Sequence, residues 1–136
     1  MLDLPWTTVR GLHALKALAR EGAPMSLGAI AREACVPPSR AARLLRILRS
    51  AGLVEETAPR RWTLARRPEQ ISVLAAVEAL GASRPHAEHC QADWAICVNR
   101  GGCAIAPLCR EAHERLMEIF RAHTLADLQV EMPSMF

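Results

Sequence analysis

The chain has 136 residues, of which 51% are hydrophobic, and a net charge of +3, so it is long enough to bury the core of a single domain without disulfides. No apolar run approaches the ~20 residues of a membrane span, and the N-terminal MLDLPWTTVR lacks the basic and apolar regions of a secretory signal. We therefore expect a cytoplasmic protein with no membrane partner. In that reducing compartment, the five cysteines indicate metal or redox chemistry rather than a disulfide framework.

Two short helices are predicted near the N-terminus. The segment TTVRGLHALKALAREG, residues 7–22, has apolar residues at helical spacing and ends in glycine. The segment SLGAIAREACV, residues 26–36, begins with Ser26, a residue type that caps helix N-termini. Cys35, in the turn that follows, is expected to be a small buried residue.

The segment PPSRAARLLRILRSAGL, residues 37–53, predicts a third helix, because prolines in a first turn lose no intrahelical hydrogen bond and Gly52 can end it. Three short helices joined by tight turns are typical of a helix-turn-helix module. At 100° per residue, the third helix has an apolar stripe of Ala41, Leu44, Leu45 and Leu48. Its opposite side carries Ser39, Arg43 and Arg46, and Arg40 and Arg49 flank them.

Positive charge is concentrated around this helix. Eight arginines lie between residues 40 and 67, and only Glu55 and Glu56 oppose them. Arginine can bind phosphates or a guanine edge through two parallel hydrogen bonds. The pattern favours double-stranded DNA as a partner over a merely solvated charged face.

A two-stranded hairpin is predicted next, from LVEET (53–57) and RWTLAR (61–66) separated by APR. A hairpin directly after the third helix makes the module a winged helix-turn-helix. Arg60 and Arg61 are expected near the wing tip, where they could reach phosphate or the minor groove.

Two further helices are expected on either side of a cysteine-rich segment. ISVLAAVEAL (71–80) is strongly apolar, and PLCREAHERLMEIFRAH (107–123) is long and amphipathic. The long helix is interpreted as a dimer contact, with packing against its own domain left open. Its apolar spacing comes from Leu108, Ala112, Leu116, Ile119, Phe120 and His123. The predicted organisation is a DNA-binding domain at 1–81, a cysteine-rich loop at 82–106, and a dimerisation helix with its tail at 107–136.

The segment HCQADWAICVNRGGC (89–103) holds three cysteines with six and then five residues between them. Several thiolates that converge on one site are the usual ligands of an iron–sulfur cluster, and Gly101 and Gly102 allow the loop to wrap around one. A structural zinc site would favour paired C-x-x-C spacing. A bare thiol switch is the other alternative.

The order of these features resembles the winged-helix iron–sulfur transcriptional regulators typified by IscR, NsrR and RirA. The resemblance lies in ALKALA, IAREACVPPSRAARLLRILRSAGLVEE, LARRPEQISVLAAVEAL, the three-cysteine loop and AHTLADL. It implies a mainly α, winged helix-turn-helix homodimer that binds operator DNA. It also implies that Cys90, Cys97 and Cys103 hold a [2Fe–2S] or [4Fe–4S] cluster that controls DNA affinity.

The fourth cluster ligand stays open. Cys109, six residues after Cys103, and His13 of the partner subunit are the two main candidates. His86 and His89 adjoin the first loop cysteine, and an external ligand is a further alternative. Trp6 and Trp94 are interpreted either as covers for the cluster or as ordinary packing residues.

The function predicted from the sequence is therefore a cluster-controlled DNA-binding regulator that senses redox state, iron or cluster status, or nitric oxide. One alternative is a cofactor-free or thiol-switch regulator of the same fold. A small iron–sulfur electron-transfer or cluster-carrier protein is the alternative from another class. No phosphate-binding glycine loop or paired carboxylates indicate an enzyme.

Overall fold

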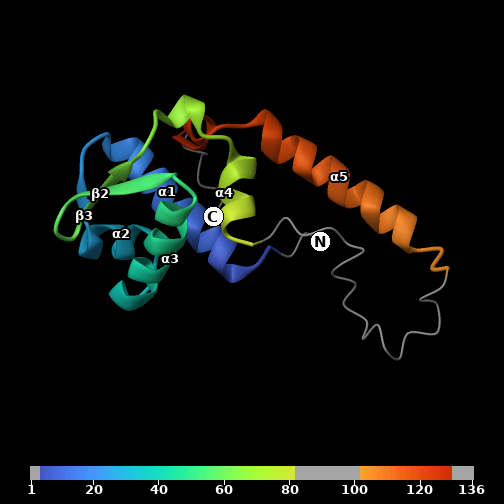
Figure 1. The fold of residues 1–136 in the computed structure, drawn as a ribbon, viewed down its shortest axis with the longest axis horizontal. Coiled ribbons are helices and arrows are strands. Elements are labelled where there is room, and N and C mark those ends of the chain that lie inside the picture. The colour runs from blue at the N-terminus through green and yellow to red at the C-terminus, as the bar shows by residue number, and fades with distance from the viewer. Residues whose placement is uncertain (1–3, 82–101, 130–136) are drawn as a thin grey trace, which may run out of the picture.

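The computed structural model describes residues 4–81 and 102–129, and confirms the predicted class, a mainly α winged helix-turn-helix with a long C-terminal helix (Figure 1). The chain builds a helical body that carries a small sheet, and one long helix extends from it. In chain order the elements are α1 (Trp6–Glu21), β1 (Met25–Ser26), α2 (Leu27–Glu33), α3 (Pro38–Ser50), β2 (Val54–Ala58), β3 (Arg61–Leu64), the 3₁₀ turn η1 (Pro68–Gln70), α4 (Val73–Ala79), α5 (Ala106–Ala122) and the 3₁₀ turn η3 (Leu125–Gln129).

The ends of the first helices follow from the residues found there. Helix α1 stops at Gly22, which adopts a left-handed φ of 65° and donates its N–H to the Leu18 carbonyl. Ser26 caps α2 as predicted, since its hydroxyl accepts a hydrogen bond of 3.2 Å from the Ala29 N–H. Helix α3 begins at Pro38, where a missing N–H breaks no helical hydrogen bond.

The prediction that Cys35 is buried is wrong. Cys35 is exposed and has a φ of 55° at the turn between α2 and α3. Its neighbours Ala34 and Val36 are buried instead, and the turn is closed by a hydrogen bond from the Val36 N–H to the Ala31 carbonyl. The left-handed backbone at this one position turns the thiol outward while both neighbours reach the core.

The sheet contains three antiparallel strands in the order β1-β3-β2. The predicted hairpin is present as β2 and β3, and its register shifts between Glu56 and Ala58. The additional strand β1 pairs Met25 with Trp62 and Ser26 with Arg61. Because β1 leads directly into α2, the end of the wing next to its turn is joined to the helix-turn-helix by backbone hydrogen bonds.

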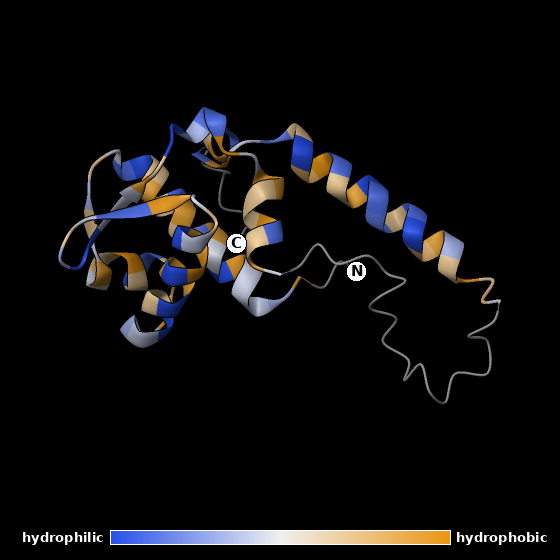
Figure 2. Cartoon of the chain, in the orientation of Figure 1, coloured by the Kyte–Doolittle hydropathy of each residue, from blue (hydrophilic) through white to orange (hydrophobic). Residues whose placement is uncertain are grey.

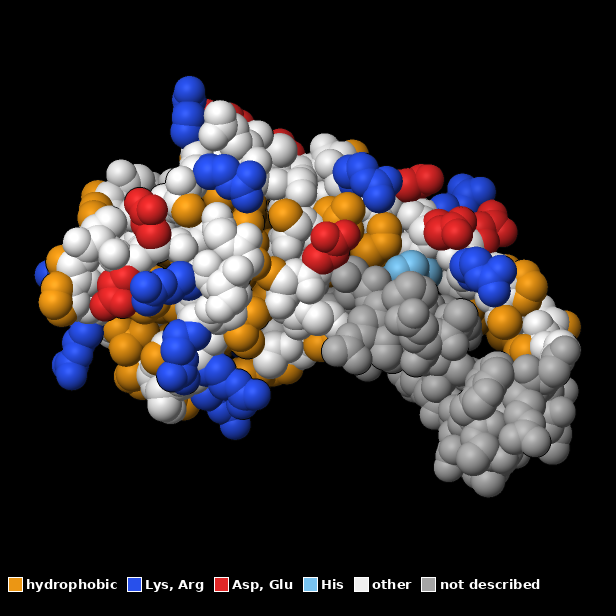
Figure 3. Space-filling model, in the orientation of Figure 1, with side chains coloured by type: hydrophobic (Ala, Val, Ile, Leu, Met, Phe, Trp, Pro, Cys, Tyr) orange, Lys and Arg blue, Asp and Glu red, His pale blue; other side chains and the backbone are white. Residues whose placement is uncertain are grey.

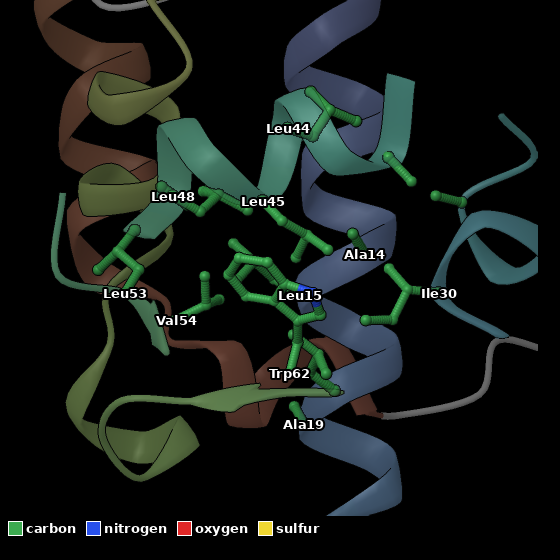
Figure 4. Close-up of a cluster of buried hydrophobic side chains, with 14 of the residues drawn as sticks. Ala14, Leu15, Ala19, Ile30, Leu44, Leu45, Leu48, Leu53, Val54 and Trp62 are labelled. Atoms are coloured by element: carbon green, nitrogen blue, oxygen red, sulfur yellow. The ribbon is translucent and has the colours of Figure 1, made fainter. Parts of the chain in front are cut away.

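One hydrophobic core supports both the helices and the wing (Figure 4). Leu15 of α1, Ile30 of α2 and Leu45 of α3 are fully buried within it. Trp62, on β3, points into the same cluster and is 6% exposed. A buried tryptophan of this size ties the hairpin to the helices through its large apolar area.

Helix α5 is attached to the body at its C-terminal end. Val73 donates its N–H to the His123 carbonyl at 2.8 Å, and Leu125 donates to the Ile71 carbonyl at 3.0 Å. The N-terminal half of α5 stands away from the winged-helix body (Figure 1). Met117 is the one buried residue of this helix, so packing against its own domain covers only a small part of its surface.

Apolar and polar residues alternate along the length of α5 (Figure 2). Three of the predicted apolar positions share one face of the helix, since Leu108, Ala112 and Ile119 fall within about 40° of one another. That face lies roughly opposite Met117, and all three residues are exposed. Among the described helices, none combines the length and apolar character needed to cross a membrane.

Candidate nucleic-acid interface and cysteine segment

Helix α3 presents the predicted polar face to solvent. Ala41, Leu44, Leu45 and Leu48 are buried as the helical angles predicted. Ser39, Arg40, Arg43, Arg46 and Arg49 are all exposed. The space-filling view shows Lys and Arg side chains over the region of α3 (Figure 3). A straight helix with buried leucines on one side and guanidinium groups on the other can enter a DNA major groove.

The wing lies beside one flank of this helix. Arg60 is at the turn between β2 and β3 with a φ of 61°, and both Arg60 and Arg61 are exposed. A groove of about 250 Å³ separates the wing from α3. Arg46, Arg49 and Arg60 line it, so the predicted DNA contacts from the two elements meet along one groove.

Glu56 organises this groove through contacts that its charge alone did not predict. One oxygen of its carboxylate, Oε1, accepts a hydrogen bond of 2.9 Å from the backbone N–H of Arg60. The other, Oε2, lies 3.6 Å from Nη1 of Arg49 on α3. Glu56 therefore closes the wing turn and connects the wing to α3 through a single side chain. In the sequence, the four-residue separation of Glu56 and Arg60 across the predicted turn was the one feature that could have indicated this contact.

Trp6 lies at the other flank of α3. The centre of the Arg40 guanidinium is 4.8 Å from the centroid of the indole ring, and that of Arg10 is 5.9 Å from it. Both distances are within the range of cation–π attraction. Trp6, Arg40 and Arg43 line an open pocket of about 420 Å³ that also reaches Leu80 at the end of α4.

The structure describes only part of the predicted cluster site. Cys103 and Cys109 are half-buried, lie at the N-terminal end of α5 and form no disulfide. The Cys109 N–H donates to the Ile105 carbonyl in the first turn of the helix. Cys90 and Cys97 lie outside the described residues, as do His86, His89 and Trp94. Two thiols near one helix end fit the donor chemistry of an iron–sulfur cluster, but within residues 4–81 and 102–129 no three potential ligands converge on a metal.

His13, the other candidate ligand, is exposed on α1. It lines a groove of about 410 Å³ with Leu12, Lys16 and Asp127. Neither Cys103 nor Cys109 lines that groove. Its role as a ligand from the partner subunit stays a prediction.

The winged helix, the basic face of α3 and the wing arginines define a DNA-binding protein of the helix-turn-helix class. The profile of the Rrf2 family, described as an iron-dependent transcriptional regulator, matches residues 6–131. The chain belongs to the Rrf2 family, whose members are transcriptional regulators.

Solved structures share this fold over nearly the whole chain. CymR of B. subtilis, a global cysteine regulator, is 21% identical and has a TM-score of 0.74, with 97% of this chain and 99% of that chain covered. The oxidized form of Staphylococcus aureus CymR is 19% identical and has a TM-score of 0.76, with 98% of this chain and 100% of that chain covered. IscR of T. potens is 24% identical and has a TM-score of 0.70, with 93% of this chain and 85% of that chain covered. A comparison with curated proteins finds no match.

Proposed function

We propose that this protein is a homodimeric transcriptional regulator that binds operator DNA through α3 and the wing. The observation that carries the proposal is the exposed arginine face of α3, directly opposite a fully packed leucine stripe. Arg43 lies at the middle of that face, where a helix docked in the major groove brings side chains to base edges. Arg46, Arg60 and Arg61 lie toward the wing and are assigned to the sugar–phosphate backbone.

The exposed apolar face of α5 supports the dimer. Leu108 is 68% exposed and Ile119 is 56% exposed, although both belong to a helix with a regular apolar stripe. A second copy of α5 would bury this stripe and, at about 25 cal/mol per Å² of apolar area, supply a favourable free energy of association. Two copies would then place two α3 helices in successive major grooves, about one helical turn apart.

The division of the chain into three parts follows from this proposal. Residues 1–81 bind DNA, residues 82–106 form the sensing segment, and residues 107–136 form the dimerisation helix and tail. The sensing segment connects α4, which is packed within the DNA-binding unit, to the N-terminal end of α5. A change in its conformation would therefore act on the relative placement of the two α3 helices. A coupling of ~1–3 kcal/mol is enough to change operator occupancy 5- to 150-fold.

We assign Cys90, Cys97 and Cys103 as the cluster ligands, with Cys109 or the partner subunit's His13 as the fourth. When bound, a [2Fe–2S] or [4Fe–4S] cluster supplies a redox-sensitive and iron-dependent link among these side chains. The family description, iron-dependent transcriptional regulator, supports this assignment. The residues themselves contribute thiolates from a segment directly between the DNA-binding unit and the dimer helix.

A thiol switch without a cluster is the second candidate. Cys103 and Cys109 are both free and half-buried, and the similar structures include an oxidized form of CymR. Under this candidate, the same segment would respond to oxidation of its cysteines. The two candidates differ in whether iron and sulfide accompany the purified protein.

Binding of duplex DNA by wild type and an Arg43→Ala, Arg46→Ala double variant tests the proposal. Fluorescence anisotropy with a mixed-sequence duplex of about three helical turns measures affinity across a salt series. We expect the double variant to bind at least ~10-fold more weakly and its salt slope to fall by about 1, because Arg46 is assigned to phosphate and Arg43 to base edges. The matched control is Arg20→Ala with Arg121→Ala, which removes the same charge from exposed positions on α1 and α5. Equal losses in both double variants would contradict an interface on α3.

A further inference from the structure

The contact between Trp6 and Arg40 joins the first turn of α1 to the first turn of α3. Resting on the proposed function, we infer that Trp6 is a positioning residue that holds Arg40 for contact with a DNA phosphate. Trp6 is 43% exposed, yet its ring lies 4.8 Å from the Arg40 guanidinium. Tryptophan provides the strongest cation–π partner among the aromatic side chains, so the exposed ring orients the arginine.

Arg40 is held differently from the arginine at the opposite flank of α3. Arg49 lies 3.6 Å from the Glu56 carboxylate, which occupies part of its hydrogen-bonding edge. Within the part of the chain that the structure describes, no carboxylate lies within 4.0 Å of the Arg40 guanidinium nitrogens. The indole therefore takes the place of an acidic partner and adds no negative charge to the DNA-binding surface.

The contact with the indole leaves the donors of Arg40 available. A cation–π contact uses the charge of the guanidinium and no hydrogen-bond acceptor, so the N–H groups can still form paired hydrogen bonds to phosphate. An arginine free in solvent would lose rotamer freedom on binding DNA. Because Trp6 already restricts Arg40, part of that entropy loss is incurred before DNA arrives.

The pocket beside this pair has a mixed lining. Its polar residues are Thr7, Arg40 and Arg43, and Trp6, Leu44, Ile47 and Leu80 complete the wall of a volume of about 420 Å³. Two arginines at its edge can bind a phosphodiester group. Arg43 is one helical turn from Arg40, nearer the middle of the exposed face. This placement assigns Arg43 to the base edges and Arg40 to the adjoining phosphate.

A double-mutant cycle on DNA affinity tests the inference. The variants are Trp6→Leu, Arg40→Ala and their combination, measured against the same mixed-sequence duplex. We expect Trp6→Leu to weaken binding about 3- to 10-fold in the wild-type background. It should change affinity less than about 2-fold in the Arg40→Ala background, because the residue it positions is then absent. Trp6→Phe keeps a ring face and should recover at least half of the loss on a logarithmic scale.

Two results would overturn the positioning role. Wild-type affinity in Trp6→Leu would show that Arg40 needs no partner. An equal loss in both backgrounds would make Trp6 a DNA contact in its own right. Thermal melting of each variant checks the fold. Arg40→Lys is a second test of the contact with Trp6, because an ammonium group keeps the charge without a planar face. Wild type that binds no duplex would instead refute the proposed function itself.

Discussion

Gly11 of α1 lies directly against Leu80 at the end of α4. A Cβ atom built on Gly11 would be 2.5 Å from Cδ1, 2.8 Å from Cδ2 and 3.2 Å from Cγ of Leu80. All three distances are shorter than ordinary van der Waals contact, so the Leu80 side chain occupies the space that a side chain at position 11 would need. Leu80 follows the last residue of α4 and directly precedes Gly81, the last described residue before the cysteine-rich segment.

Gly11→Ala should therefore destabilise the protein. Leu80 is 8% exposed and belongs to the core, so displacing it costs about 1–3 kcal/mol, which exceeds the gain of about 1 kcal/mol in helix propensity. Urea denaturation should show a net loss of about 1 kcal/mol. The control is Gly28→Ala in α2, where a Cβ meets nothing within 4 Å; its stability should stay the same or rise by up to ~1 kcal/mol. A stabilised Gly11→Ala variant would contradict the close contact.

Removing the charge of Glu56 should strengthen binding to duplex DNA. In Glu56→Gln, the amide oxygen can still accept the hydrogen bond from the Arg60 N–H, but Arg49 loses its anionic partner and becomes available to phosphate. We expect about 3- to 10-fold tighter binding at low salt by anisotropy, and a change in folding stability within ~1 kcal/mol. Glu55→Gln, at the next position along β2, removes the same charge away from the Arg49 and Arg60 contacts. A similar gain in both variants would indicate only a net-charge effect.

The exposed face of α5 should control the oligomeric state. Leu108→Lys with Ile119→Lys places two charges on the apolar stripe proposed to bury itself in the dimer, and burying an unpaired charge is costly. Sedimentation velocity should show a shift from dimer to monomer, with the helical content unchanged. Glu114→Lys, at an exposed polar position on the same helix, should remain dimeric. A dimeric double variant would place the interface elsewhere.

Cluster assembly should depend on Cys103 and be independent of Cys35. After anaerobic reconstitution, wild type should show a visible absorption band together with iron and sulfide. Cys103→Ala should be colourless, whereas Cys35→Ala, which changes an exposed thiol at the turn between α2 and α3, should keep its colour. Loss of colour in Cys109→Ala would make Cys109 the fourth ligand, and retention would direct attention to His13 of the partner subunit. A colourless, iron-free wild type would leave the thiol-switch candidate.

The helices were predictable because their signals are local. The leucine stripe of α3, the Ser26 cap and the stop at Gly22 each depend on residues within a few positions of one another. The strand β1 was missed, since the two residues Met25 and Ser26 carry no alternating pattern. It forms only because β3, more than thirty residues later in the chain, offers an edge for pairing.

The site was predictable in its composition and less so in its contacts. The arginines of α3 follow from helical angles, whereas the partners of Arg40 and Arg49 come from other elements and depend on the tertiary fold. Helical spacing found the apolar stripe of α5 but could not say which part of it the domain covers. Cys35 was misjudged, because a left-handed backbone angle at one turn reverses the direction of its side chain.

The mode of attachment of α5 has a mechanical consequence. The helix has 17 residues and is therefore about 25 Å long, and its hydrogen-bonded connections to Ile71 and Val73 are at the C-terminal end. It is thus a lever with its pivot beside α4. A tilt of about 10° at that pivot moves the opposite end by about 4 Å. Cys103 precedes that end by three residues. A displacement of a few ångströms around the thiols therefore corresponds to a rotation of only a few degrees at the pivot. The stiffness of α5 determines how much of the displacement is converted into that rotation.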